Sequence, residues 1–256
     1  MSTQIHSSQI HLLDEEEEQE VPGFDAEGFA KHALSSKQSL AAAIDHTLLK
    51  PEATQEQVIR LCRDAAEYRF ACAMVNPTWA ALAYSELAGT GVPVGVVVGF
   101  PLGASMGTTK REEAAALVKV GAHDVDMVIN VGLLKSGENQ AVQQEIEGVV
   151  AVVHDAGSIV KVILETCLLA VEEKLRASEL AIAAGADFIK TSTGFSTGGA
   201  TPEDVAMMRG VAGGRCGVKA SGGIRTLADA QRMLEAGANR IGASASVAIV
   251  NELRGN

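Results

Sequence analysis

Residues 186–225 read ADFIKTSTGFSTGGATPEDVAMMRGVAGGRCGVKASGGIR and contain one complete strand, helix and strand unit. The runs 187–191 and 217–219 have the length and composition of buried strands, and Thr201-Pro202 between them is typical of a helix start. Strands without a polar face are buried on both sides, and a helical crossover between them makes them parallel. The stretch therefore predicts a parallel α/β sheet whose strands end in polar, glycine-containing loops.

The same unit repeats along residues 39–256 without a break in composition. Helix boundaries agree with it, because Thr54 and Gln57 fit a capping box. Four glycines stand where helices should end, namely Gly121, Gly157, Gly185 and Gly237. Eight strands are expected, at 41–45, 71–75, 94–98, 125–131, 159–164, 187–191, 217–219 and 240–242. This number favours a closed (β/α)8 TIM barrel of one domain over an open doubly wound sheet, for which no dinucleotide-binding or P-loop glycine motif is found.

The composition is that of a globular protein, with 47% apolar and 21% charged residues among 256. A formal net charge of −11 would repel a polyphosphate backbone, so nucleic acid is not expected as a partner. No apolar stretch approaches the roughly 20 residues of a membrane span, and no signal-peptide pattern opens the chain. The four cysteines lie far apart, without metal-ligand spacing. We expect a cytoplasmic protein that contacts no membrane and uses neither a metal nor a cofactor.

Residues 1–38 differ from the rest by their acidity. Two lysines, Lys31 and Lys37, face eight acids, so the segment alone carries −6; the acids are Asp14, Glu15, Glu16, Glu17, Glu18, Glu20, Asp25 and Glu27. Runs of like charge are usually solvated, and we expect part of this N-terminal extension to be poorly ordered. Residues 24–33 could form a helix that covers the bottom of the barrel.

Two lysines close predicted buried strands, where a charge must be paired or removed. Lys190 and Lys219 are expected at the mouth of the barrel, where active sites of this fold lie, and Asp126 faces the interior from an otherwise apolar run. Either lysine alone is explained as an ion-paired structural residue or a phosphate ligand. The pair with Asp126 favours imine chemistry, because a Schiff-base lysine must be neutral and a second ammonium lowers its pKa. The spacing does not decide which lysine is the nucleophile.

Glycine-rich turns follow the last two predicted strands. Ser221-Gly222-Gly223 precedes a helix that starts near Thr226, and Gly242-Ala243-Ser244 precedes the final helix. Backbone N–H groups in such turns and at helix N-termini bind anions, and barrels often bind phosphate after these strands. The sequence therefore predicts a phosphate site next to the two lysines.

Six motifs, in the expected order, resemble those of the deoxyribose-phosphate aldolases, which are class I aldolases with the (β/α)8 fold. The resemblance runs from about residue 39 to the end, over 44–51 (IDHTLLKP), 97–103 (VVGFPLG), 125–130 (VDMVIN), 188–195 (FIKTSTGF), 218–225 (VKASGGIR) and 242–244 (GAS). It implies reversible cleavage of 2-deoxy-D-ribose 5-phosphate to D-glyceraldehyde 3-phosphate and acetaldehyde, in deoxyribose phosphate catabolism. We also expect a homo-oligomer, either a dimer or a tetramer.

The resemblance also implies a role for each motif residue. Lys190 matches the Schiff-base lysine, Lys219 the lysine that lowers its pKa, and Asp126 the carboxylate that transfers protons through water. The substrate-binding positions, most of them backbone N–H contacts to phosphate, are Asp45, Thr47, Lys161, Thr193, Gly194, Gly222, Gly223, Ile224, Arg225, Gly242 and Ser244.

Three features depart from the family pattern. Met74 replaces a cysteine of many relatives, His123-Asp124 replaces the usual Asp-Glu, and the acidic extension 1–38 is longer than the family needs. Phe195 stands where some members have a phosphate-binding lysine and others have Phe. Two alternatives to the aldolase remain open. Another imine-forming, phosphate-binding barrel enzyme would share the lysines and glycines without releasing acetaldehyde, and a catalytically silent protein would bind the sugar phosphate only.

Overall fold

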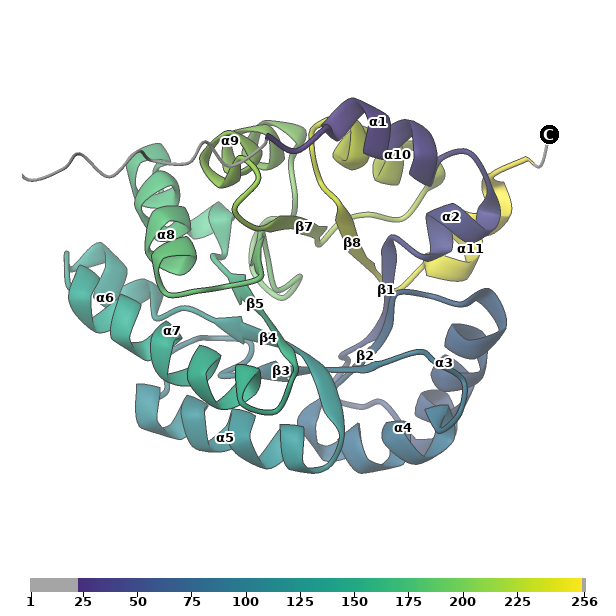
Figure 1. Cartoon of the computed structure of the whole chain (residues 1–256), viewed down its shortest axis with the longest axis horizontal. Coiled ribbons are helices and arrows are strands. Elements are labelled where there is room, and N and C mark those ends of the chain that lie inside the picture. The colour runs from purple at the N-terminus through teal and green to yellow at the C-terminus, as the bar shows by residue number, and fades with distance from the viewer. Residues whose placement is uncertain (1–22, 255–256) are drawn as a thin grey trace, which may run out of the picture.

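The structure is a computed structural model that describes residues 23–254. Its centre is a closed barrel of eight parallel strands in chain order, enclosed by helices (Figure 1). The predicted (β/α)8 barrel is therefore confirmed. The strands are β1 (Ile44–Leu48), β2 (Cys72–Val75), β3 (Val94–Val98), β4 (Ala122–Val128), β5 (Ile159–Ile163), β6 (Phe188–Lys190), β7 (Gly217–Ser221) and β8 (Arg240–Ala243).

Helices separate successive strands and begin at the capping residues expected from the sequence. Thr54 and Gln57 form the capping box of α3, and Thr201 accepts a hydrogen bond at the start of α9. No helix in the described part of the chain is long and apolar enough to cross a membrane. The helices are α1 (Ala26–Ala33), α2 (Lys37–Ala41), α3 (Gln55–Tyr68), α4 (Ala80–Leu87), α5 (Gly107–Lys119), α6 (Val131–Lys135), α7 (Asn139–His154), α8 (Val171–Ala183), α9 (Pro202–Ala212), α10 (Leu227–Glu235) and α11 (Ser246–Glu252), with 3-10 turns η1 (Pro77–Trp79) and η2 (Thr166–Leu168).

Most strands lie within two residues of their predicted limits, but two are shifted by three residues. The first begins at Ile44 rather than at Ala41, because residues 37–41 form α2. The fourth begins at Ala122 and ends at Val128, because Asn130 caps α6 by accepting a hydrogen bond from the amide of Leu133 at 3.1 Å. Apolar composition alone does not separate a buried strand from an adjoining buried helix turn.

The barrel interior has an apolar half and a charged half. Leu49, Cys72, Met74 and Val97 pack together in the apolar half, beside β1–β3. Gly95 is required there, because a Cβ at this position would collide with the side chains of Cys72 and Met74. Strands β4–β8, together with Asp45 of β1, direct charged side chains inward, and these form the candidate site.

Residues 23–38 pack against the end of the barrel at which the strands begin. Helix α1 contacts α10 and buries Ala30 and Ala33 (Figure 1). The ring of Phe24 lies 4.1 Å from the guanidinium carbon of Arg209. That guanidinium donates to three carbonyls just before β7 and β8, those of Gly213, Cys216 and Gly237. The helix expected over 24–33 is thus present, while residues 1–22 of the predicted extension lie outside the described residues.

We predict that residues 23–38 stabilise the barrel without taking part in chemistry. A chain that starts at Ser39 uncovers α10 and Arg209, and should lose about 1–3 kcal/mol of unfolding free energy relative to a chain that starts at Gly23. The aldolase activity expected from the resemblance should differ by less than about tenfold. Urea unfolding and turnover of the two chains test this, and a larger loss of activity in the folded shorter chain would contradict it.

Candidate active site

Seven charged side chains meet inside the barrel and form what we call the charge network. Residues two apart on a strand share a face, so Asp124 and Asp126 both point inward. Strand register pairs Asp126 with Lys161 and Lys219 with Arg240. The members are Asp45 of β1, Asp124 and Asp126 of β4, Lys161 of β5, Lys190 of β6, Lys219 of β7 and Arg240 of β8.

Asp126 connects the two lysines that the sequence singles out. Its Oδ2 lies 2.8 Å from Lys190 Nζ and 2.6 Å from Lys219 Nζ. Its Oδ1 lies 3.3 Å from Lys161 Nζ. The side chains of Lys190, Lys219 and Asp126, which the sequence pattern predicts to lie together, are therefore in direct contact.

Asp45 and Asp124 bind the remaining cations from the other side. Asp45 Oδ2 lies 2.5 Å from Lys219 Nζ, and its Oδ1 accepts a hydrogen bond from Arg240 at 2.7 Å. Asp124 accepts a hydrogen bond from Lys161 and lies 2.7 Å from the ring nitrogen Nδ1 of His123 at the barrel edge. Each carboxylate of the network thus faces at least two cationic groups.

Neighbouring cations keep the buried carboxylates ionised. Burial by itself would raise the pKa of Asp126, but Lys190, Lys219 and Lys161 hold that pKa well below its usual range. For Lys219, burial acts to lower the pKa, and the carboxylates of Asp126 and Asp45 overcome it and raise the pKa. Lys219 therefore stays protonated.

Lys190 is the exception among the cations of the network. Burial lowers its pKa to about 8, and the ammonium of Lys219 adds to the shift while Asp126 opposes it. The number of charges in the network also favours a neutral Lys190, because the three carboxylates already face the three positive charges of Lys161, Lys219 and Arg240. A proton on Lys190 gives the network a positive surplus, so this amine is the one most easily made neutral.

A cavity of about 370 Å³ opens above Lys190 toward the mouth of the barrel. Its rim carries the cations Lys50 and Arg225, and none of the described residues that line it is acidic. The lining residues are Thr47, Leu48, Leu49, Lys50, Lys190, Thr193, Gly194, Phe195, Ser221, Gly222, Gly223, Ile224, Arg225, Gly242, Ala243 and Ser244. A larger hollow of about 760 Å³ beside residues 99–113 lies outside the barrel mouth and touches none of the network residues.

Most of the predicted substrate-binding positions line this cavity, but Asp45 and Lys161 do not. Both are fully buried in the network below it, where they contact Lys219 and Asp126. The structure therefore places these two where they act on the lysines rather than on a bound molecule.

Glycines shape part of the cavity wall. Gly194, Gly222 and Gly223 have φ values of 84°, 88° and 81°, a region that favours glycine. A Cβ on Gly199 would collide with the backbone of Gly222, so Gly199 serves close packing. A Cβ on Gly223 would meet no atom within 4 Å, which leaves this turn open to the cavity.

The turn itself, rather than the next helix, offers the free backbone N–H groups. The amides of Arg225 and Thr226 donate to Asp229 at 3.1 and 3.0 Å, so the start of α10 is capped by its own carboxylate. A contact between Arg225 and an anion would therefore come from its guanidinium. This differs from the expectation that the N-terminus of this helix holds the anion.

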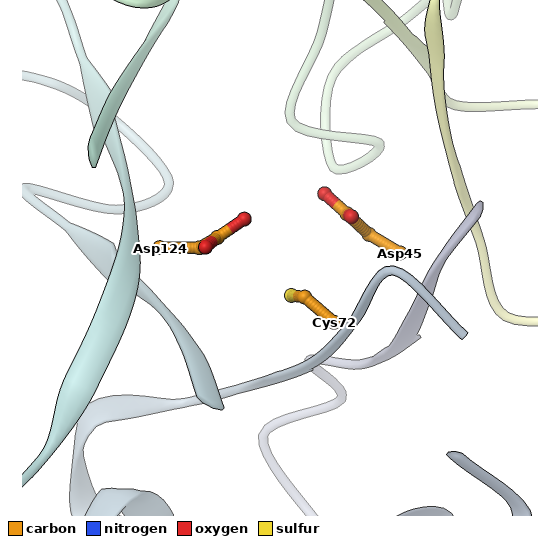
Figure 2. A group of neighbouring side chains, drawn as sticks. All are labelled: Asp45, Cys72 and Asp124. Atoms are coloured by element: carbon orange, nitrogen blue, oxygen red, sulfur yellow. The ribbon is translucent and has the colours of Figure 1, made fainter. Parts of the chain in front are cut away.

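Asp45, Cys72 and Asp124 point toward one another within the barrel, with ligand atoms less than 4.8 Å apart (Figure 2). Such a group could hold a metal ion, but both carboxylates are ion-paired to Lys161 and other cations of the network. Burial and the two carboxylates raise the pKa of the Cys72 thiol, which keeps it protonated. We assign the two aspartates to the charge network, with Cys72 as a neutral neighbour, and do not assign the group to a metal site.

A family model described as DeoC/LacD family aldolase matches residues 39–251. The chain belongs to this family of aldolases. It is 56% identical over 218 residues to a deoxyribose-phosphate aldolase of Bacillus mycoides (strain KBAB4), covering 85% of this chain and 97% of the relative. The deoxyribose phosphate aldolase of Aeropyrum pernix, described as tetrameric, superimposes with a TM-score of 0.83 at 37% identity, covering 89% of this chain and 96% of that one. A structure described as QR15, an aldolase, superimposes with a TM-score of 0.79 at 40% identity, covering 83% of this chain and 94% of that one.

Four residues of the enzyme's site are not predicted as site residues from the sequence. Asp124 stands out there only as a departure from the family pattern, although its spacing of two from Asp126 signals the same face. Arg240 has no comparable sequence signal, and Lys50 lies within the motif 44–51 but is given no role there. Glu165, with φ 58°, accepts hydrogen bonds from the amide and hydroxyl of Thr193 and so holds the loop after β6.

We predict that Lys190 titrates near pH 8 and that Lys219→Met moves this titration upward. Removing the ammonium ends its repulsion of a protonated Lys190 and leaves Asp126 free to favour that charge, so the pKa rises toward the ordinary value. Competitive acetylation followed by peptide mass mapping measures the midpoint as a function of pH. Lys135→Met, on the exposed face of α6, is the control, and an unchanged midpoint in Lys219→Met would show that burial alone sets the pKa.

Proposed function

We propose that the enzyme is a class I aldolase that reversibly cleaves 2-deoxy-D-ribose 5-phosphate to D-glyceraldehyde 3-phosphate and acetaldehyde, with Lys190 as the Schiff-base residue. The observation that carries this proposal is the position of Lys190. It is the network lysine that lines the cavity, and its pKa is lowered to about 8. An amine with that pKa is neutral in about one molecule in ten at pH 7, against about one in 2,500 for an ordinary lysine.

The residues of the network account for each step of such a cleavage. Neutral Lys190 Nζ attacks C1 of the sugar aldehyde, and loss of water from the carbinolamine gives an iminium. Removal of the C3 hydroxyl proton breaks the C2–C3 bond, and the bonding electrons convert the iminium to an enamine. Glyceraldehyde 3-phosphate leaves, C2 takes up a proton, and hydrolysis releases acetaldehyde and restores the amine. Asp126, at 2.8 Å from Lys190 Nζ, is placed to exchange these protons through water.

The rim of the cavity supports recognition of a phosphate. Lys50 and Arg225 are positive, no lining residue is acidic, and Gly222 and Gly223 expose backbone at an open turn. The whole chain carries −11, so this local positive field is set by the site and not by the overall charge. Binding of the remote phosphate would hold C1 against Lys190.

We further propose that the enzyme acts in the cytoplasm as a homo-oligomer, either a dimer or a tetramer. The four cysteines are free thiols, which supports a reducing compartment. The tetrameric description of the Aeropyrum pernix aldolase supports the higher assembly. Acetaldehyde release from 2-deoxyribose 5-phosphate is the direct test of the activity, and it separates this reaction from other imine-forming chemistry and from binding alone.

We predict that Lys190→Arg forms no adduct with acetaldehyde. Arginine keeps the positive charge beside Asp126, but its guanidinium stays protonated and cannot form an imine. Borohydride trapping followed by peptide mapping should find the adduct on Lys190 in the parent enzyme and also, more slowly at pH 7, in Lys219→Met. An adduct on Lys219 would reverse the roles of the two lysines.

We predict that Gly223→Asp weakens the binding of the sugar phosphate much more than Gly223→Asn does. Both side chains have the same shape and tolerate positive φ better than most, but only aspartate brings a negative charge to the open turn. The apparent affinities for 2-deoxyribose 5-phosphate should differ by more than about tenfold between the two variants. The two variants should bind free 2-deoxyribose with similar affinities. Equal affinities of the two variants for 2-deoxyribose 5-phosphate would show that the phosphate binds elsewhere.

A further inference from the structure

Ser221 presents a buried hydroxyl that has no partner in the described structure. The residue lines the cavity, and only 6% of its surface is exposed. Its Oγ is buried and makes no hydrogen bond. A hydroxyl in this situation costs free energy unless a bound molecule satisfies it, so it points to a ligand contact.

The backbone of Ser221 is already held in place by its neighbours. Its amide donates to Thr191 Oγ1 at 3.1 Å, and its carbonyl accepts from that hydroxyl at 3.1 Å and from the amide of Ala200 at 3.0 Å. The backbone that carries the hydroxyl is therefore fixed without any hydrogen bond from the side chain itself. Such preorganisation is what a recognition group requires.

The hydroxyl lies between the two ends of the proposed substrate site. Ser221 follows Lys219 by two residues on β7, so its side chain points inward one step nearer the mouth. A Cβ on Gly242 would collide with Ser221 Oγ, so the missing side chain of Gly242 provides the space for this hydroxyl. The next residue, Gly222, begins the open turn assigned to phosphate. A molecule that spans from Lys190 to this turn passes Ser221 at its middle.

We propose that Ser221 Oγ hydrogen-bonds the C4 hydroxyl of the substrate and is a specificity-determining residue of the site. This inference rests on the proposed function. The C3 oxygen must give up its proton near Lys190 at the floor of the cavity, below which Asp126 lies, and C5 carries the phosphate, so C4 is the carbon whose hydroxyl comes level with Ser221. A serine both donates and accepts, which suits a hydroxyl partner.

Aldol synthesis with two acceptor aldehydes tests the proposal. Acetaldehyde is added either to D-glyceraldehyde 3-phosphate, whose 2-hydroxyl becomes the C4 hydroxyl, or to 3-oxopropyl phosphate, which lacks it. In Ser221→Ala we expect kcat/KM for the first acceptor to fall about three- to tenfold, with little change for the second. The preference of the parent enzyme for the hydroxylated acceptor should thus shrink by the same factor.

Ser192→Ala is the matched control. Ser192 Oγ is also buried without a partner, but the residue does not line the cavity, so the acceptor preference should be unchanged in this variant. A general loss of packing would slow both acceptors equally in Ser221→Ala, and that result would overturn the proposal, as would an unchanged preference. Borohydride trapping of acetaldehyde on Lys190 distinguishes this failure from failure of the proposed function, because the acetaldehyde imine carries no hydroxyl and should form normally in both serine variants.

Discussion

Three carboxylates buried inside the barrel are the constraint on which the site depends. They come from two strands, β1 with Asp45 and β4 with Asp124 and Asp126, which lie on either side of the strands that carry the cations. Each carboxylate needs a positive partner, because an unpaired buried charge destabilises a fold by several kcal/mol. The successive pairings from β4 to β8 supply these partners, because one cation on each of β5, β6, β7 and β8 is brought level with the carboxylates. The strand register of this side of the barrel thus also sets the charges that surround its lysines.

In the proposed reaction, the positive surplus of the network also favours bond cleavage. A protonated Lys190 and an iminium on Lys190 carry the same charge at the same place, so the repulsion from Lys219 that lowers the lysine pKa also destabilises the iminium. Cleavage converts that cation to a neutral enamine and removes the surplus. The arrangement therefore acts on two steps, because it supplies the free amine and it raises the free energy of the iminium relative to that of the enamine.

Features set by local pattern can be predicted from the sequence, whereas features set by contact across the barrel cannot. The strand and helix alternation, the glycine turns and the strand-end lysines are periodic or compositional signals, and the structure has them within a few residues. Arg240 stands at a strand start where a solvated end is the ordinary expectation, and only the pairing of β8 with β1 brings it to Asp45. The placement of Glu165 also depends on tertiary contact. Its backbone is left-handed, and its side chain accepts a hydrogen bond from the amide of Thr193, which links the loop after β5 to the loop after β6.

The surroundings of the network explain why these charges act strongly on one another. Phe188 lies below it, with its ring centre 5.9 Å from Lys161 Nζ and 5.4 Å from the Arg240 guanidinium carbon, and Gly217 leaves room for that ring. Cys72 and its apolar neighbours close one side. Charges in such low-dielectric surroundings interact more strongly than charges in water. Of the three network lysines only Lys190 reaches the cavity, so the group that would meet the substrate in the proposed reaction is also the one whose pKa burial and the Lys219 ammonium lower.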